Sequence, residues 1–330
     1  MSAPAPAVTA PAPAPAVAAR PAHSALTEAY TRMTEVFPAL GVTELAPGEP
    51  APTGDGRIAV ARLAEAGPEF ESFLAWDDEQ VLADHGRRAR PDVIASFGLH
   101  RYAWPACLLI TVPWFVLRRV PRFPVQDVTF QRMPGRIAVR VGEFACLPDD
   151  PAATLPGARV VPDEEALRAE VRASVAEHLE PVLSGFGPRM RRRGRALWAM
   201  ATDEVVESLH YVAGLLGEQE RATRELERLF PGTGTGGGGG GAAGIGAATA
   251  TGSTSASASA STKPYVGAAG FREVTGPNGE CLPTRDRASC CFYYTLDAED
   301  TCANCPRNTE AVRIAKLAAQ AAEAAEAAAG

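Results

Sequence analysis

The feature that most constrains the fold is a run of Gly, Ala, Ser and Thr at 231–263, which separates a long N-terminal part from a short C-terminal part. Such a run has too few large apolar side chains to offset the entropy of ordering it. We expect a flexible linker there, and a disordered Ala/Pro tail at 1–23. Folded structure should therefore lie in 24–230 and 264–306. The Ala/Glu-rich tail at 307–330 has strong helix formers but little to pack against, so we expect a fraying helix there.

The part at 24–230 carries patterns that are typical of helices. Apolar residues recur at helical spacing after Ser24, a residue suited to capping a helix. The longest apolar stretch should be a buried helix that is broken or kinked at Pro105 and Pro113. The expected helices cover 24–37, 56–66, 68–85, 93–119, 162–183, 188–217 and 218–230.

One short region departs from the helical pattern. The segments "VQDVTF" and "RIAVRV" alternate with a period of two around "QRMPG", which predicts a β-hairpin. The predicted fold class is therefore mainly α with a small β-hairpin insertion. The helical N-terminal domain would be joined to a small C-terminal module.

Charge and hydropathy exclude several function classes. The net charge of −7 and the lack of a helix-turn-helix pattern argue against nucleic acid as a partner. The most apolar run, Ala106–Leu117, is interrupted by Pro113 and is too short to span a bilayer, so we expect no stable membrane insertion. The N-terminus lacks the pattern of a secretory signal, and we expect a cytoplasmic protein.

Four of the seven cysteines fall within sixteen residues of the C-terminal module: Cys290, Cys291, Cys302 and Cys305. A piece this small needs a metal, disulfides or a neighbouring surface to be stable. In a cytoplasmic chain, clustered thiols favour metal or redox chemistry over structural disulfides. Four thiolates are the ligand set of a tetrahedral zinc site or of an iron–sulfur cluster.

The spacing favours iron–sulfur over zinc, with a disulfide pair behind both. Adjacent side chains in an extended strand point to opposite faces, so Cys290 and Cys291 can share a site only where the backbone turns. Such a pair is easier to explain for a cluster whose two irons are approached separately. The other cysteines, Cys107, Cys146 and Cys281, are expected to be two buried inert thiols and one spare thiol.

The cysteine segment and two stretches upstream of it resemble a known family. "RASCCFYYTLDAEDTCANCP" is similar to the C-terminal signature of the FhuF-type ferric-siderophore reductases, in which a Cys-Cys-x10-Cys-x2-Cys run binds one [2Fe–2S] cluster. Upstream, "HRYAW" and "HLEPVL" with "GPRMRRRGRALWAMATDEV" are similar to the helical domain of that family. The resemblance implies that Cys290, Cys291, Cys302 and Cys305 are the cluster ligands.

It also implies an iron–sulfur oxidoreductase that passes one electron to the Fe(III) of a siderophore, most readily a hydroxamate, and releases Fe(II). No side chain need act as a catalytic acid or base. The Gly run lacks the Lys and Ser/Thr of a phosphate loop, so an external ferredoxin-like donor is implied rather than NAD(P)H. Two alternatives remain: an iron–sulfur redox or iron sensor acting through a partner, and a structural zinc module on a non-catalytic siderophore-binding protein.

Substrate contacts are less well defined by the sequence. The basic run Arg189, Arg191, Arg192, Arg193 and Arg195 is either a solvated helix face or a surface for an anionic siderophore or acidic donor. His178 lies on an apolar helix face and is more typical of a hydrogen-bonded core histidine than of a ligand.

Overall fold

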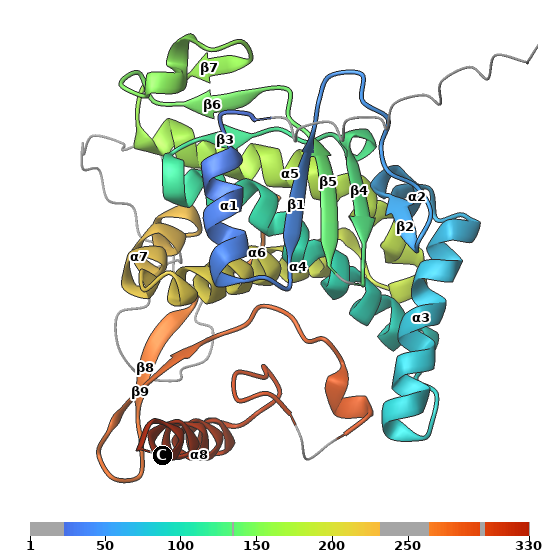
Figure 1. The fold of residues 1–330 in the computed structure, drawn as a ribbon. Helices are drawn as coiled ribbons and strands as arrows, with labels where there is room; N and C mark the ends of the chain where they lie inside the picture. Colours follow the sequence, from blue (N-terminus) through green and yellow to red (C-terminus); the bar gives the residue numbers. More distant parts are fainter. Residues whose placement is uncertain (1–22, 134, 232–263, 298–300, 330) are drawn as a thin grey trace, which may run out of the picture.

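The computed structural model describes residues 23–133, 135–231, 264–297 and 301–329. The segments expected to be disordered, 1–23 and 231–263, lie outside these residues except for one position at the edge of each. The described chain is mainly helical, as predicted, with short strands on one side of the helices (Figure 1). The expected single hairpin understates the β content, which comprises two small sheets and a separate hairpin among the described residues.

Three long helices form the centre of the core: α4 (Pro91–Leu117), α5 (Glu164–Met190) and α6 (Gly194–Leu215). The first of these packs against the other two and is buried on nearly every side. It is continuous through Pro105 and Pro113, so the predicted break is wrong. Proline lacks an N–H, and the carbonyl of Leu109, four residues before Pro113, instead accepts a bond from the Tyr30 hydroxyl at 2.9 Å.

By length and composition α4 is the single helix in the described ranges that could cross a membrane. However, 78% of its most apolar stretch is buried inside the protein. This burial is what the core helix of a soluble protein shows, and it agrees with the expectation that the chain makes no stable membrane insertion.

The remaining helices follow the predicted pattern with shifted ends. The prediction over 68–85 is confirmed, whereas 56–66 begins as a strand and becomes helical only at Val60. Helix α5, which carries His178, runs on through Pro188 and ends at Met190, and the φ of 53° at Arg191 then turns the chain away. The remaining helices are α1 (Thr27–Val36), α2 (Val60–Glu65), α3 (Pro68–His85), α7 (Gln219–Leu229) and α8 (Glu310–Ala329).

The predicted hairpin is confirmed as β4 (Val128–Gln131) and β5 (Arg136–Arg140), but it is the middle of a larger sheet. The order is β1-β5-β4-β2, in which β1 (Gly41–Leu45) is parallel to β5 and β2 (Arg57–Ala59) is antiparallel to β4. The burial of β1 does not alternate and β2 has only three residues, so neither shows a strand pattern in the sequence. A second sheet has the order β3-β6-β7, with strands Val120–Pro121, Phe144–Cys146 and Ala158–Val160.

The C-terminal module docks on the helices rather than standing alone. Its antiparallel hairpin, β8 (Phe271–Thr275) and β9 (Cys281–Arg285), lies below α6 and α7, and the chain then passes toward the end of α3 (Figure 1). Helix α8 follows, and its Arg313 is buried in an ion pair with Asp286. The tail was expected to have little to pack against, and for the first turns of α8 this is wrong.

Candidate metal centre

Asp203 anchors the segment that precedes the cysteine pair. It lies on α6 and is completely buried. Its carboxylate accepts backbone N–H bonds from Ala288 (3.1 Å) and Ser289 (2.8 Å), a bond from the Ser289 hydroxyl (2.6 Å), and an ion pair from Arg285. A buried carboxylate is costly unless it is fully partnered. Because this one is partnered by residues 285–289, it ties the segment that leads into Cys290 and Cys291, called the first cysteine arm, to the helical domain.

Arg287 lies beneath the same arm. Its side chain is 10% exposed and makes two long ion pairs, from Nε to Asp203 at 3.9 Å and from Nη1 to Glu207 at 3.8 Å, and its buried Nε–H has no hydrogen-bond partner. It lies within electrostatic range of the thiols of Cys291 and Cys302. A buried guanidinium beside two thiols suits an anionic group bound at that place.

The two upstream segments "HRYAW" and "GPRMRRRGRALWAMATDEV" meet next to this arm. His100 of "HRYAW" donates from Nδ1 to Oε1 of the buried Glu204 at 2.8 Å. The negative charge of Glu204 raises the pKa of His100, against the opposing effects of burial and of Arg287. Glu204 follows Asp203 directly, so α6 presents two buried carboxylates to two different partners.

The backbone turns at the cysteine pair, as the side-by-side arrangement requires. Phe292 has a φ of 68°, in the left-handed region that side chains other than Gly and Asn rarely occupy. Its N–H donates to the sulfur of Cys290 at 3.4 Å. A non-glycine residue in this conformation is held there by its surroundings. The chain is therefore not a regular strand at and just after the pair, which is the condition for Cys290 and Cys291 to share a site.

The second cysteine arm is a short loop closed on itself. The N–H of Cys305 donates to the carbonyl of Cys302 at 3.0 Å, and the Asn308 amide donates to the same carbonyl at 3.0 Å. Asn308 also accepts a bond from the Thr301 hydroxyl, and Lys316 of α8 donates to the Thr301 carbonyl at 2.6 Å. The first turns of α8 therefore hold the C-x2-C loop in place.

The four module thiols lie in one neighbourhood. The thiol of Cys290 interacts electrostatically with those of Cys291 and Cys305, and the thiol of Cys302 interacts with the same two. The pKa of Cys302 is raised to about 11, chiefly by loss of solvation; Arg287 opposes the shift and the nearby thiols add to it. All seven cysteines are free, so the disulfide alternative receives no support.

The thiols do not form a closed coordination shell. Among the described residues, no three His, Cys, Asp or Glu side chains are close enough together to hold a metal ion. The residues nevertheless fit a cluster chemically, because four thiols lie in one neighbourhood and the positive charge of Arg287 acts on two of them. The assignment of Cys290, Cys291, Cys302 and Cys305 as ligands stays a prediction.

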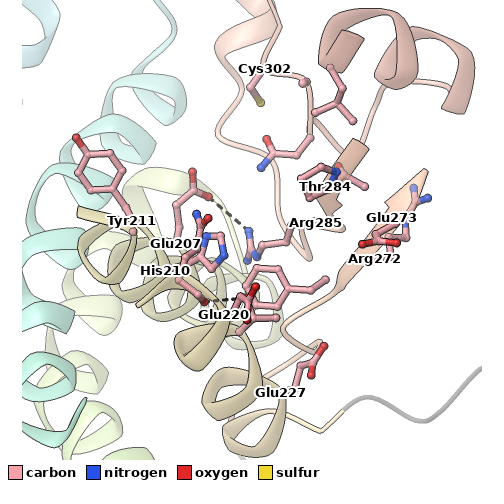
Figure 2. A pocket seen from close by; sticks show the side chains of 18 of the residues that line it. Glu207, His210, Tyr211, Glu220, Glu227, Arg272, Glu273, Thr284, Arg285 and Cys302 are labelled. Atoms are coloured by element: carbon pink, nitrogen blue, oxygen red, sulfur yellow. Dashed lines mark hydrogen bonds and ion pairs between the residues drawn. The ribbon is translucent and has the colours of Figure 1, made fainter. Parts of the chain in front are cut away.

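A cleft of about 1430 Å³ opens next to the exposed Cys302 (Figure 2). It lies between α6 and α7 on one side and the β8–β9 hairpin with α8 on the other. Phe37, Trp104 and Tyr211 form an aromatic cluster in its wall, with ring centroids 5.6–5.8 Å apart. Its charged lining is mixed and includes Glu207, Glu220, Glu227, Arg224, Arg272, Glu273 and Arg285.

The basic run divides into three roles. Arg189 pairs with Glu71. Arg192 reaches the module: its guanidinium donates to the Cys290 carbonyl at 3.1 Å and stacks 4.1 Å from the centre of the Phe292 ring. The other three members, Arg191, Arg193 and Arg195, are exposed and are called the arginine edge below. A smaller groove of about 570 Å³ runs along it, beside Trp198 of α6.

The buried carboxylates of α6 were missed in the sequence. Asp203 and Glu204 are buried in α6, directly before the apolar Val205 and Val206. Acidic residues are rarely buried unless they are paired, so two of them next to an apolar run are the signal that would have found this site. The expectation for His178 is confirmed: it is buried, with Nδ1 donating to the Phe123 carbonyl and Nε2 accepting from the Tyr102 hydroxyl.

Of the three other cysteines, two are buried and one is exposed. Cys107 and Cys146 are buried as expected, and burial raises the pKa of both thiols. Cys281, the spare thiol, is exposed at the start of β9, where it is hydrogen-bonded to Glu273.

Comparison with known proteins supports the resemblance on the cysteine segment. Residues 287–307 match the family model described as the FhuF 2Fe-2S C-terminal domain. The match spans both cysteine arms and points to a [2Fe–2S] cluster as the cofactor of an iron–sulfur protein of the ferric-siderophore reductase type. No curated protein matches the chain.

Proposed function

We propose that this protein is a ferric-siderophore reductase, in which one electron passes from a [2Fe–2S] cluster to siderophore-bound Fe(III) and Fe(II) is released. The observation that carries the proposal is the match of 287–307 to the FhuF 2Fe-2S C-terminal domain, on a segment whose four thiols share one neighbourhood. The ligands would be Cys290, Cys291, Cys302 and Cys305.

A bound cluster would supply a reversible one-electron carrier, and the chain's residues would set its environment. Four thiolates favour the low end of a range of potentials from about −700 to +450 mV, and the region 264–306 contains no His that would raise the potential in the Rieske manner. Arg192, Arg287 and the N–H of Phe292 place positive charge and a hydrogen bond near the thiols. Such groups stabilise added negative charge and tune the potential upward.

The cleft beside Cys302 is the place for the ferric complex. Its volume exceeds the usual 300–1,000 Å³ of small-molecule pockets, so a bulky chelate fits. Each hydroxamate is a monoanion, so a ferric hydroxamate complex carries little net charge. A wall of mixed charge with the aromatic residues Trp104 and Tyr211 suits such a ligand better than a highly anionic one. Hard hydroxamate oxygens hold Fe(III) more strongly than Fe(II), so reduction loosens the complex.

The remaining parts of the proposal concern the electron source and the compartment. We infer an external ferredoxin-like donor, because the chain lacks a nucleotide-binding glycine fingerprint followed by a helix. We place the reaction in the cytoplasm. The free thiols among the described cysteines suit a reducing compartment.

The test is a single-turnover reaction without a protein donor. Dithionite-reduced protein, freed of excess reductant under anaerobic conditions, is mixed with a ferric trihydroxamate and a chromogenic Fe(II) trap. The proposal predicts trapped Fe(II) in proportion to the reduced cluster that is consumed. Reoxidation without trapped Fe(II) would support the sensor alternative, and colourless zinc-containing protein would support the structural zinc module.

A further inference from the structure

The arginine edge differs from the other charged surfaces of the molecule. Exposed arginines such as Arg62 and Arg159 lie in ion pairs with glutamates. By contrast, none of the ion pairs found among the described residues involves Arg191, Arg193 or Arg195. Two acidic residues lie in this region: Asp92 senses the charge of Arg191 but is itself bonded to Arg90, and Glu180 lines the groove along the edge without an ion pair to it. Three positive charges therefore stay largely uncompensated in a chain of net charge −7.

The edge flanks a residue that contacts the cysteine pair. Between Arg191 and Arg193 lies Arg192, which contacts both the Cys290 carbonyl and the Phe292 ring. The groove along the edge shares no lining residue with the cleft beside Cys302. The four thiols thus have two separate approaches of different chemistry.

From these observations we propose that the arginine edge is the docking surface for an acidic one-electron carrier protein, which delivers its electron on the Cys290 side. This inference rests on the proposed function. In the docked pair the carrier is oxidised by one electron and the cluster is reduced by one, and the ferric complex later takes that electron as Fe(III) becomes Fe(II). No bond forms or breaks and no proton moves during docking.

The geometry favours a protein over a small anion as the occupant. Sites for small anions bring several donors together in a partly enclosed place, whereas the side chains of Arg191, Arg193 and Arg195 are exposed to solvent. Arg192, the half-buried member of the run, is already engaged with Cys290 and Phe292. Electron-transfer complexes bury little surface and depend on charge for encounter and orientation. A chain that is acidic overall repels an acidic carrier elsewhere, so the edge directs its approach.

The experiment compares two triple variants with the same change in charge. R191Q/R193Q/R195Q removes the edge, and R62Q/R136Q/R159Q removes three exposed arginines elsewhere. A plant-type ferredoxin is the probe. Its oxidised form is titrated against each protein to obtain Kd, and its reduced form is mixed in a stopped-flow instrument to obtain the second-order rate constant, both over a range of ionic strength.

The proposal predicts that the edge variant loses at least about tenfold in the low-salt rate constant and that its salt dependence flattens, with a parallel weakening of Kd. The control variant should retain most of the wild-type rate. Reduction by dithionite and single-turnover release of Fe(II) should be unchanged in both, which separates docking from the proposed function itself.

Three results would overturn the proposal. The first is equal loss in the edge and control variants, and the second is wild-type protein that neither binds the ferredoxin nor accepts its electron. The third is an edge variant with a normal ferredoxin rate that has lost binding of a ferric tris-catecholate, because the edge would then be a small-anion site.

Discussion

The arginine edge and the cleft approach the same four thiols with opposite character. The edge is exposed and positive, and Arg192, which lies between two of its members in the sequence, contacts the module at Cys290 and Phe292. The cleft is hollowed, has an aromatic wall and mixed charge, and meets the module at Cys302. A one-electron relay needs an entry for the donor and an exit to the acceptor. The difference indicates how one small module can keep a protein partner and a small ferric complex apart.

The largest effect is expected at Cys302, the thiol on the cleft side. Cys302→Ser should abolish incorporation of iron and sulfide, because a cluster held by four thiolates loses one of them. The matched control is Cys281→Ser, which removes an exposed thiol of the same module. Iron, sulfide and the visible spectrum measure the outcome. Equal iron content in the two variants would contradict the ligand assignment.

Asp203 holds the segment before Cys290, which lies between the edge and the cleft, so its loss should affect both surfaces. Asp203→Asn leaves Arg285 without its buried counter-charge and removes an acceptor for the backbone at Ser289. Breaking a buried ion pair costs about 3–5 kcal/mol. Urea unfolding should show a lower free energy of unfolding, and iron content should fall.

The control for Asp203 is Asp78→Asn, which breaks an exposed pair with Arg88. That change should cost no more than about 1 kcal/mol. If the two variants unfold at the same urea concentration, Asp203 does not anchor the module.

A change confined to the cleft should alter only substrate binding. Tyr211 is 49% exposed and stacks edge-on with Phe37 and Trp104. Tyr211→Ala removes an aromatic contact worth about 0.5–1.5 kcal/mol, so KM for a ferric hydroxamate should rise about fivefold with kcat unchanged. Leu155→Ala, at another exposed apolar side chain, should leave KM as it is. A changed kcat for Tyr211→Ala, or an unchanged KM, would place the substrate elsewhere.

The smallest effect is expected at His100, which lines neither the cleft nor the groove along the arginine edge. Glu204 raises the pKa of His100 above 6.5, so the pair stabilises the fold below pH 6.5 and the contribution is lost as pH rises through the folded-state pKa. His100 is half exposed, and after screening the contribution is under about 1 kcal/mol. The difference in unfolding free energy between wild type and His100→Gln should therefore shrink as pH rises above 6.5. A difference that grows with pH would mean that His100 is neutral in the fold.

The sequence predicted those elements that its local patterns determine. Helix α3 follows from helical periodicity, and the β4–β5 hairpin follows from alternation around a turn. The unbroken α4 was not predictable, because the carbonyl left without a partner near Pro113 is satisfied by Tyr30 of a distant helix.

The candidate site was predicted only in its ligands. The cysteine spacing is local and visible, whereas Asp203 binds residues more than eighty positions away. Likewise, Arg192 could not be separated from its basic neighbours by composition. Only the fold places it on Cys290 and Phe292 and leaves Arg191, Arg193 and Arg195 exposed.

The most direct test of the central claim is EPR spectroscopy of the dithionite-reduced protein together with quantitation of iron and acid-labile sulfide. If Cys290, Cys291, Cys302 and Cys305 hold one [2Fe–2S] cluster, iron and sulfide are present in equal amounts at two per chain, and reduction produces the signal of a single unpaired electron. Zinc without sulfide and without a signal would contradict the account.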